Sequence, residues 1–266
     1  MKVTLITSTY NFPRALTLCL DSILTQTRTP DEIVIADDGS DDRTKEVVRR
    51  FIGKTSIPVK HVWQENHGFG KTAAMNKGFA VSTGDYIIQI DGDIIMERHF
   101  VEDHLRYARK GIFLCGSRSR VTQAFTERLF RGEKLTLGFW HPGLDDRMNA
   151  LRCCLLTPFF KNYRHLRGCN MSFWREDVER VNGYDEVFNV YGYEDEDLQN
   201  RLQRTGVNKV FIKFMCIEYH LYHPEHPTKR QLAETRKIID RNNDNSLVVS
   251  EQGIAQHRQE HNLILY

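Results

Sequence analysis

The first 110 residues alternate short apolar runs with amphipathic segments, and this alternation limits the possible folds more than any other feature. Short apolar runs separated by segments with helical spacing are typical of βαβ units and of a mainly parallel sheet flanked by helices. We therefore predict an α/β fold, with strands at 2–7, 31–38, 59–65 and 85–91 and helices at 14–27, 42–54 and 71–82.

The bulk composition is that of an ordinary globular enzyme. The chain of 266 residues is 40% hydrophobic and 27% charged, and its net charge of +2 predicts no nucleic-acid partner. No apolar run approaches the roughly 18 residues that a membrane span needs. The first residues, MKVTLITSTYNF, have too short an apolar stretch for a signal peptide, and the six cysteines are scattered. We expect a cytoplasmic protein with reduced thiols.

Polar, glycine-containing loops follow each of the four predicted strands. They lie at 8–11, 37–40, 65–71 and 91–93, and in an open parallel sheet such loops meet at the carboxyl edge, where ligands bind. Four converging loops of this kind predict a ligand site at that edge.

The tripeptide Asp91-Gly92-Asp93 ends the fourth strand. Two residues apart on a strand, the two aspartates are expected to share a face and to hold Mg²⁺ or Mn²⁺ jointly with a phosphate. A plain turn after a strand is the alternative reading of this tripeptide. In the other loops, Lys71 is placed to reach a diphosphate, Asp38 to accept hydrogen bonds from a base or ribose, and Tyr10 to border a base.

A run of four acidic residues, Glu194–Asp197, precedes a predicted amphipathic helix that Gly206 ends. Acidic side chains suit the first turn of a helix, where the dipole favours negative charge. One of these carboxylates is equally suited to act as a general base. The stretch alone leaves both readings open.

The region 118–167 is irregular and basic, with ten basic and four acidic residues. A loop that folds over a bound donor is one reading, and contact with an anionic membrane through residues such as Arg152, Lys161 and Arg164 is the other. Residues 111–121 and 208–224 are each expected to include one strand, 167–177 a strand followed by the start of a helix, and 230–241 a polar helix.

Taken in order, several of these motifs resemble glycosyltransferase family 2. The first half supplies STYN, DDGS, NHGFGKTAAMNKG and DGD, and the second supplies RGCNMSFWRED, VNGYDEVF, YGYEDEDLQNRL and YHLYHP, which resemble the half shared with galactosyltransferases and chondroitin-type polymerases. The resemblance covers residues 2–224. It implies a GT-A fold, in which a Rossmann-like sheet is joined to a smaller acceptor-side subregion, and an inverting enzyme with a nucleotide-sugar donor and a divalent metal.

The resemblance also assigns roles to individual residues. On the donor side it implies nucleotide-sugar contacts by Ser8, Tyr10, Asp38, Asn66, Lys71, Asp91, Gly92 and Asn170. For the metal, Mn²⁺ or Mg²⁺, it implies Asp93, His220 and Asp91, with His223 competing with His220. It implies Asp195 as the base and Glu194 as a sugar-holding residue. Asp197 is then expected to be a cap or solvent residue.

The same resemblance gives a division of the chain and a set of partners. We expect a nucleotide-sugar half at 1–110, a metal- and acceptor-binding half of the same domain at 111–224, and a C-terminal helical extension at 225–266. The expected partners are a UDP-sugar donor and a glycan or lipid-linked acceptor of the cell envelope, such as capsule or lipopolysaccharide, with peripheral contact at the inner face of the membrane. The alternatives are a nucleotidyltransferase acting on sugar phosphates and a non-catalytic sugar-binding module.

Overall fold

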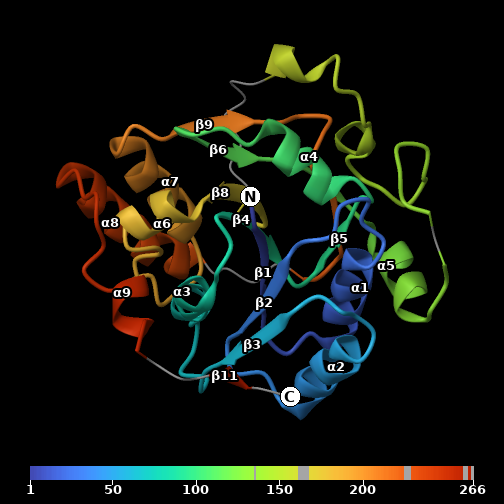
Figure 1. Ribbon diagram of the computed structural model, residues 1–266, viewed down its shortest axis with the longest axis horizontal. Coiled ribbons are helices and arrows are strands. Elements are labelled where there is room, and N and C mark those ends of the chain that lie inside the picture. The colour runs from blue at the N-terminus through green and yellow to red at the C-terminus, as the bar shows by residue number, and fades with distance from the viewer. Residues whose placement is uncertain (135, 161–167, 225–228, 260–262, 265–266) are drawn as a thin grey trace.

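An eight-stranded sheet forms the centre of the protein, with the strand order β11-β3-β2-β1-β4-β8-β6-β9 (Figure 1). The computed structural model describes residues 1–134, 136–160, 168–224, 229–259 and 263–264. The strands are β1 (Val3–Thr9), β2 (Glu32–Asp37), β3 (Val59–Trp63), β4 (Tyr86–Asp91), β6 (Ile112–Cys115), β8 (Asn170–Trp174), β9 (Asn208–Phe211) and β11 (Leu263–Ile264). Strands β3, β2, β1 and β4 are parallel, as are β6 and β9, whereas β8 and β11 run antiparallel to their neighbours.

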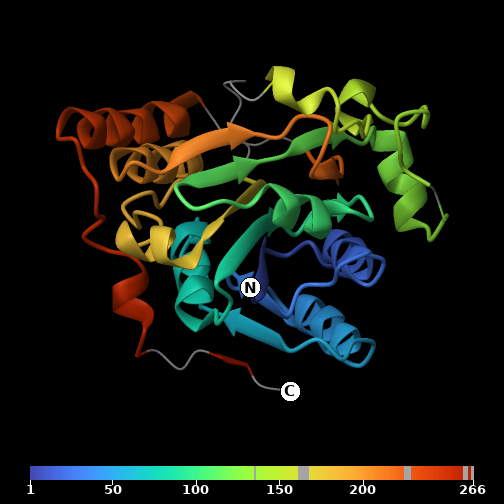
Figure 2. The same cartoon turned by 45° about the horizontal axis from the view of Figure 1, so that its top comes forward.

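Helices cover both faces of this sheet (Figure 2). One face packs against α1 (Pro13–Ile23), α2 (Asp42–Ile52) and α4 (Phe100–Tyr107) in one hydrophobic cluster. The other face packs against α3 (Lys71–Val81), α6 (Arg175–Arg180), α7 (Glu194–Arg204) and α9 (Ile254–His257) in a second cluster. The predicted α/β fold with a mainly parallel sheet is therefore confirmed.

The parallel register brings strand ends together at one edge of the sheet. Ser8 on β1 lies beside Asp91 on β4, and Thr9 lies beside Asp37 on β2. The loops that follow these strands therefore start from neighbouring positions, as the sequence pattern predicts.

A second, three-stranded sheet has the order β5-β10-β7 and consists of β5 (Ile94–Met96), β10 (Ile217–His220) and β7 (Ser117–Arg120). The expectation of one strand in each of 111–121 and 208–224 was wrong, because each region contributes one strand to each sheet. At the first break a Cβ atom on Gly116 would overlap Asn170 and Cys216, and at the second Phe214 and Cys216 adopt positive φ. Both breaks are therefore packed turns between the sheets.

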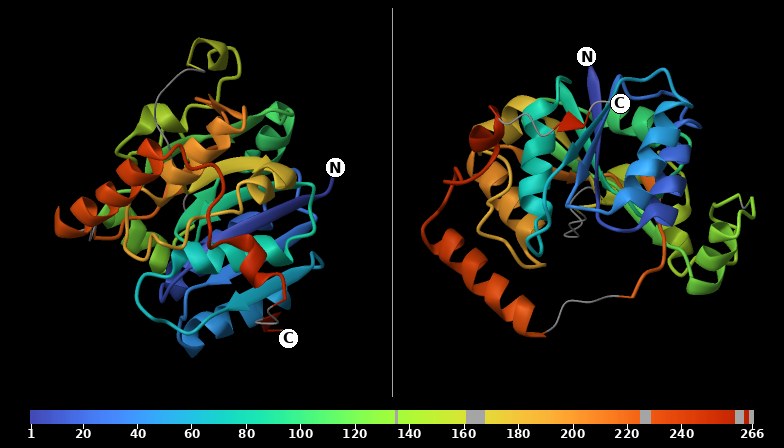
Figure 3. Two further views of the ribbon diagram at one scale, coloured as in Figure 1. Left: turned by 90° about the vertical axis from the view of Figure 1, so that its left-hand side faces the viewer. Right: turned by 90° about the horizontal axis from the view of Figure 1, so that it is seen from below.

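Two further segments lie outside the sheet layers (Figure 3). The helix α5 (Gln123–Phe130) and the 3₁₀ turns Arg147–Ala150 and Thr157–Phe160 belong to the basic region. The helix α8 (Lys229–Asp244) includes the predicted polar helix and contacts α7 from the outside. No helix in the described part of the chain combines the length and apolarity needed to cross a bilayer.

Candidate active site

A cleft of about 510 Å³ opens at the carboxyl edge of β1, β2 and β4. The residues that line it include most of those predicted for the donor, namely Ser8, Tyr10, Asp38, Asn66, Lys71, Asp91 and Gly92, together with Asp93 from the predicted metal site. Tyr10 is 52% exposed, which leaves its ring accessible to a base. The structure thus brings the four predicted loops to one cavity.

Asp38, at the end of β2, is hydrogen-bonded to the loop after β3. Its Oδ1 accepts a hydrogen bond of 2.7 Å from Gln64 Nε2, and its Oδ2 accepts one of 2.8 Å from the Gly70 amide. Burial raises the pKa of Asp38, against the effect of these two donors. A Cβ atom at Gly70 would overlap both side chains, so a glycine is required there. Asp38 therefore shapes the loop that carries Asn66 and Lys71.

Asp91 is held by two neighbours inside the cleft. Its Oδ1 accepts a hydrogen bond of 2.8 Å from Ser8 Oγ and lies 3.0 Å from Lys71 Nζ. Burial opposes ionisation of both partners, but the attraction between them prevails, so the pKa of Asp91 falls and that of Lys71 rises well above its ordinary value. Both groups are charged at neutral pH.

Asp93 lies in the turn after β4 and not on the strand, so the expectation that it shares a strand face with Asp91 was wrong. Its Oδ2 lies 3.1 Å from His223 Nε2 and 3.6 Å from His220 Nε2. Burial lowers the pKa of His220, whereas the hydrogen bond to Asp93 raises the pKa of His223 to about 9. The two histidines, treated as competitors from the sequence, approach the same carboxylate.

The cluster of Asp93, His220 and His223 suits a divalent cation. One ligand atom from each residue lies within 4.8 Å of the others, and within the described part of the chain Asp93 Oδ1 is buried without a hydrogen-bond partner. A mixed set of imidazole nitrogens and carboxylate oxygen fits Mn²⁺ better than Mg²⁺, which prefers oxygen ligands. Asp91 does not belong to this cluster.

Glu194 and Asp195 occupy the first turn of α7, next to Tyr193 in the left-handed conformation with φ 65°. Asp195 is half-buried, and its Oδ1 accepts a hydrogen bond of 2.7 Å from Tyr184 Oη. Glu194 is buried and accepts a hydrogen bond of 2.9 Å from the Gly192 amide. Burial and the neighbouring Asp195 raise the pKa of Glu194 to about 7, although Lys71 opposes the shift. A group with this pKa is half ionised at neutral pH.

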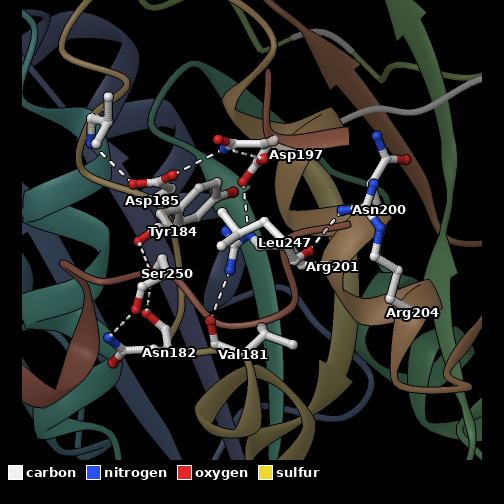
Figure 4. A network of polar contacts seen from close by, with 12 residues as sticks. Val181, Asn182, Tyr184, Asp185, Asp197, Asn200, Arg201, Arg204, Leu247 and Ser250 are labelled. Carbon is white, nitrogen blue, oxygen red and sulfur yellow. Dashed lines mark hydrogen bonds and ion pairs between the residues drawn. The ribbon is translucent and has the colours of Figure 1, made fainter. Parts of the chain in front are cut away.

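Asp197, two residues further along α7, has a different environment (Figure 4). It is fully buried and forms an ion pair of 2.7 Å with Arg201, which is fully buried too. Its other oxygen accepts a hydrogen bond of 2.9 Å from Asn242 on α8, which also donates to Asp185 at 3.0 Å. The expectation that Asp197 is a cap or solvent residue was therefore wrong, because this side of the helix faces the interior.

Asn170 lies in the interior and does not line the cleft. Its Oδ1 is 3.1 Å from His104 Nε2, and its amide donates to the carbonyls of Cys216 at 2.8 Å and Ser117 at 3.2 Å. These contacts join the two sheets. The predicted position in the sugar pocket therefore does not match the structure.

In the basic region 118–167, several arginines are already paired with acidic residues of the protein. Arg152 lies 2.7 Å from Asp103, Arg120 2.8 Å from Asp146 and Arg128 2.7 Å from Glu133, while Lys161 and Arg164 lie outside the described residues. The region instead exposes large apolar side chains, at Trp140, Met148, Leu155 and Phe159.

Sequence reasoning missed the residues that support Asp195 from behind, above all Tyr184 and Gln89 on β4. Tyr184 lies within the VNGYDEVF segment, but no sequence pattern indicates where its hydroxyl points. Gln89 interrupts an otherwise apolar strand, and a lone polar residue in a buried strand is the one signal that marks it.

Family models and curated proteins match this chain. Residues 4–164 match the model of glycosyl transferase family 2, and residues 157–226 match a model described as the N-terminal domain of galactosyltransferase. The chondroitin synthase of Escherichia coli is 25% identical over 266 aligned residues, covering 90% of this chain and 37% of that protein. An uncharacterized glycosyltransferase of Nostoc sp. is 37% identical over 99 residues, covering 37% of this chain and 30% of that protein.

Solved structures share the fold at low sequence identity. Staphylococcus aureus TarS in complex with UDP-GlcNAc has a TM-score of 0.66 at 16% identity, with 97% of this chain and 69% of that chain covered. A mannosyltransferase from Pyrobaculum calidifontis, in complex with GDP-Man and Mn²⁺, has a TM-score of 0.57 at 21% identity, with 88% and 59% covered.

The chain spans about a third of the length of the two curated relatives described above. The family model, however, matches more than half of the chain, and it includes the strand-end loops that form the cleft. With its GT-A fold, the chain belongs to glycosyltransferase family 2.

Proposed function

We propose that this enzyme transfers a sugar from a UDP-sugar to a hydroxyl group of a glycan or lipid-linked acceptor, with inversion at the anomeric carbon. The observation that best supports this proposal is the position of Lys71. Its ammonium lies 3.0 Å from Asp91 at the strand edge and is also attracted by Asp195 and Glu194 at the start of α7. If the donor diphosphate binds beside Lys71, acidic groups from the end of β4 and from the start of α7 would surround its sugar.

The nucleotide is proposed to occupy the cleft between the first three loops. Tyr10 borders the base, Asp38 accepts hydrogen bonds from it, and Asn66 lies in the loop that Asp38 fixes. The solved complexes of structural relatives with UDP-GlcNAc and with GDP-Man support a nucleotide-sugar as donor. The match to chondroitin synthases supports a polysaccharide as the setting of the reaction.

Asp93, His220 and His223 are proposed to hold the divalent cation, with Mn²⁺ favoured by the two imidazoles. A cation bound there supplies positive charge to the departing diphosphate. Asp91 is proposed to keep Ser8 and Lys71 in place, so that the lysine adds a second positive charge on the same side.

Asp195 is proposed as the general base. The acceptor hydroxyl oxygen attacks the anomeric carbon, its proton passes to the Asp195 carboxylate, and the bond between the anomeric carbon and the UDP oxygen breaks. Attack opposite the leaving group inverts the configuration. Glu194, deeper in the same turn, is proposed to accept a hydrogen bond from a sugar hydroxyl.

The test is to measure release of UDP from a panel of UDP-sugars with Mn²⁺, with and without an oligosaccharide acceptor. We expect release from at least one donor and its loss with EDTA. Release of pyrophosphate from UTP and a sugar phosphate would instead support a nucleotidyltransferase. Binding of sugars without any UDP release would support a non-catalytic module.

The acceptor side also includes a proposed membrane contact. Leu155 and Phe159 are 79% and 81% exposed, and apolar side chains of this size insert into the interface of a bilayer. We expect co-sedimentation with vesicles that contain anionic lipid, lost when both residues become Ser. Arg152 is a poor candidate for this contact because Asp103 already pairs with it. A protein that stays in the supernatant at low salt would favour the alternative role of this region as a lid.

A further inference from the structure

We propose that Tyr184 is a positioning residue for Asp195, and that its hydroxyl fixes the carboxylate in the orientation needed to receive the acceptor proton. The inference rests on the proposed function, in which Asp195 is the base. Tyr184 Oη donates a hydrogen bond of 2.7 Å to Asp195 Oδ1. Tyr184 is almost completely buried, whereas Asp195 is half-buried.

The direction of this hydrogen bond follows from the second partner of the hydroxyl. Gln89 Nε2 donates to Tyr184 Oη at 2.6 Å and to the Gly168 carbonyl oxygen at 2.8 Å. A carbonyl only accepts, so the amide must present its NH₂ group to both. The single hydroxyl proton of Tyr184 is then left for Asp195. The chain of donors therefore runs from Gln89 through Tyr184 to Asp195.

The Tyr184 hydroxyl keeps its proton at neutral pH. Burial and the Asp195 carboxylate raise the pKa of Tyr184 well above its ordinary value. A protonated phenol beside an ionised carboxylate forms a charge-assisted hydrogen bond, which is stronger than a bond between neutral groups. Such a bond restricts rotation of the Asp195 side chain.

The main chain of Tyr184 is itself fixed from α3. Asn76 is fully buried, and it donates to the Tyr184 carbonyl at 2.9 Å and accepts from the Tyr184 amide at 2.8 Å. The preceding residue, Gly183, has φ 69°, and a Cβ atom there would overlap Asn76. The tyrosine is therefore held at its main chain and at its hydroxyl.

A second pair of hydrogen bonds joins the same loop to α7. These bonds set the distance between Tyr184 and Asp195. Asn242 bridges Asp185, the neighbour of Tyr184, and Asp197, two residues after Asp195. A Cβ atom at Gly168 would also overlap the Asp195 carboxylate. The carboxylate is thus packed against the Gly168 main chain and bonded to the Tyr184 hydroxyl.

The test compares Tyr184→Phe with Tyr86→Phe in the UDP-release assay. Tyr86 is a matched control, because it is also fully buried and its hydroxyl lies 2.7 Å from Ser172 Oγ, a neutral group away from Asp195. We expect kcat to fall about tenfold in Tyr184→Phe, with KM for the donor unchanged, and to stay at the wild-type value in Tyr86→Phe. Equal kcat values for the two variants and the wild type would overturn the inference.

Two further readouts separate positioning from a merely structural role. In Tyr184→Phe the low-pH limb of the kcat profile should move to higher pH, because the charged carboxylate loses a hydrogen bond that favours it. In an Asp195→Asn background the same substitution should cause less than a twofold further loss, since both changes remove one function. An unmoved profile or a full tenfold additional loss would contradict positioning.

A third variant keeps the inference testable if Tyr184→Phe does not fold. Gln89→Met removes the donor that orients the tyrosine hydroxyl, and we expect a loss of kcat of about threefold, absent in the Asp195→Asn background. Failure of the proposed function is distinguishable from failure of this inference. Near-normal turnover of Asp195→Asn overturns both, whereas an impaired Asp195→Asn with a normal Tyr184→Phe overturns the inference alone.

Discussion

The cleft at the sheet edge and the polar clusters buried behind it are both rich in charged and amide side chains, but the aspartates Asp93 and Asp197 differ in how completely their oxygens are hydrogen-bonded. In the cleft, Asp93 has an oxygen without a partner among the described residues, and Lys71 is shared by several acids. Behind it, each carboxylate oxygen of Asp197 has a partner, Arg201 or Asn242, although Arg201 Nη2 is itself buried without a partner among the described residues. A carboxylate oxygen without a partner suits ligand binding, whereas a carboxylate bonded at both oxygens holds the structure together.

The helix α7 shows this difference within a single turn. Asp195 and Asp197 are two residues apart, and on a helix such residues point about 200° apart around the axis. Asp195 is therefore half-buried beside Tyr184 and attracts Lys71, whereas Asp197 faces α8. The comparison predicts that substitutions of Asp93 or Asp195 reduce turnover and leave stability unchanged, and that breaking the buried pair of Asp197 with Arg201 does the reverse.

The largest expected effect is on stability, in Arg201→Met. The substitution leaves Asp197 buried without its cation, and breaking a buried pair in this way costs about 3–5 kcal/mol of unfolding free energy. Urea unfolding measures it. The matched control is Arg230→Met, which breaks an exposed pair with Glu234 at the same i,i+4 spacing and should cost about 0.3–0.5 kcal/mol. Similar losses in the two variants would show that burial of the pair is not what stabilises α7.

The next effect is on activity, in Asp93→Asn. A neutral amide is a poorer ligand for a hard cation, so we expect turnover to fall about 100-fold and Mn²⁺ affinity to fall with it, without a change in melting temperature. Calorimetric titration with Mn²⁺ and the UDP-release assay measure the two quantities. Asp91→Asn is the comparison, since Asp91 binds Ser8 and Lys71, and it should keep most of the Mn²⁺ affinity. The reverse order of affinities would assign the metal to Asp91.

The smallest effect is a pH dependence of stability that comes from His104. Burial lowers the pKa of His104 to about 3, against the effect of Asn170, while an unfolded histidine titrates near 6.5. Between these values the unfolded chain binds one more proton, so stability falls as the pH falls. From pH 7.5 to 5.5 the wild type should lose about 1.4 kcal/mol more than His104→Gln. If the wild type and His104→Gln lost the same stability between these two pH values, His104 would have to be charged in the folded interior.

The cleft could be predicted from the sequence, because strand alternation fixes where strand ends meet. Once the four apolar runs are paired in parallel, the loops carrying Ser8, Asp38, Lys71 and Asp91 must lie at one edge. That inference needs only the alternation of apolar strands and amphipathic helices along the sequence. Their individual contacts, such as the ion pair of Lys71 with Asp91, depend on rotamers and were not predictable.

The buried polar clusters could not be predicted in the same way. Asn170 was assigned to the sugar pocket and Asp197 to the surface, yet both are fully buried and bonded to protein groups. Their partners, His104 and Asn242, are far away in the sequence and belong to no periodic pattern. A polar residue gives the same sequence signal whether it faces solvent or a buried partner, so tertiary packing decides between them.

The most direct test of the account is the turnover of Asp195→Asn, measured together with its melting temperature and its affinity for UDP. We predict a loss of kcat of about 100-fold or more, the scale of lost general-base catalysis, with the melting temperature and UDP affinity of the wild type. Near-normal kcat in a protein with an unchanged melting temperature would contradict the account, and would make the acidic run Glu194–Asp197 a helix N-terminus only.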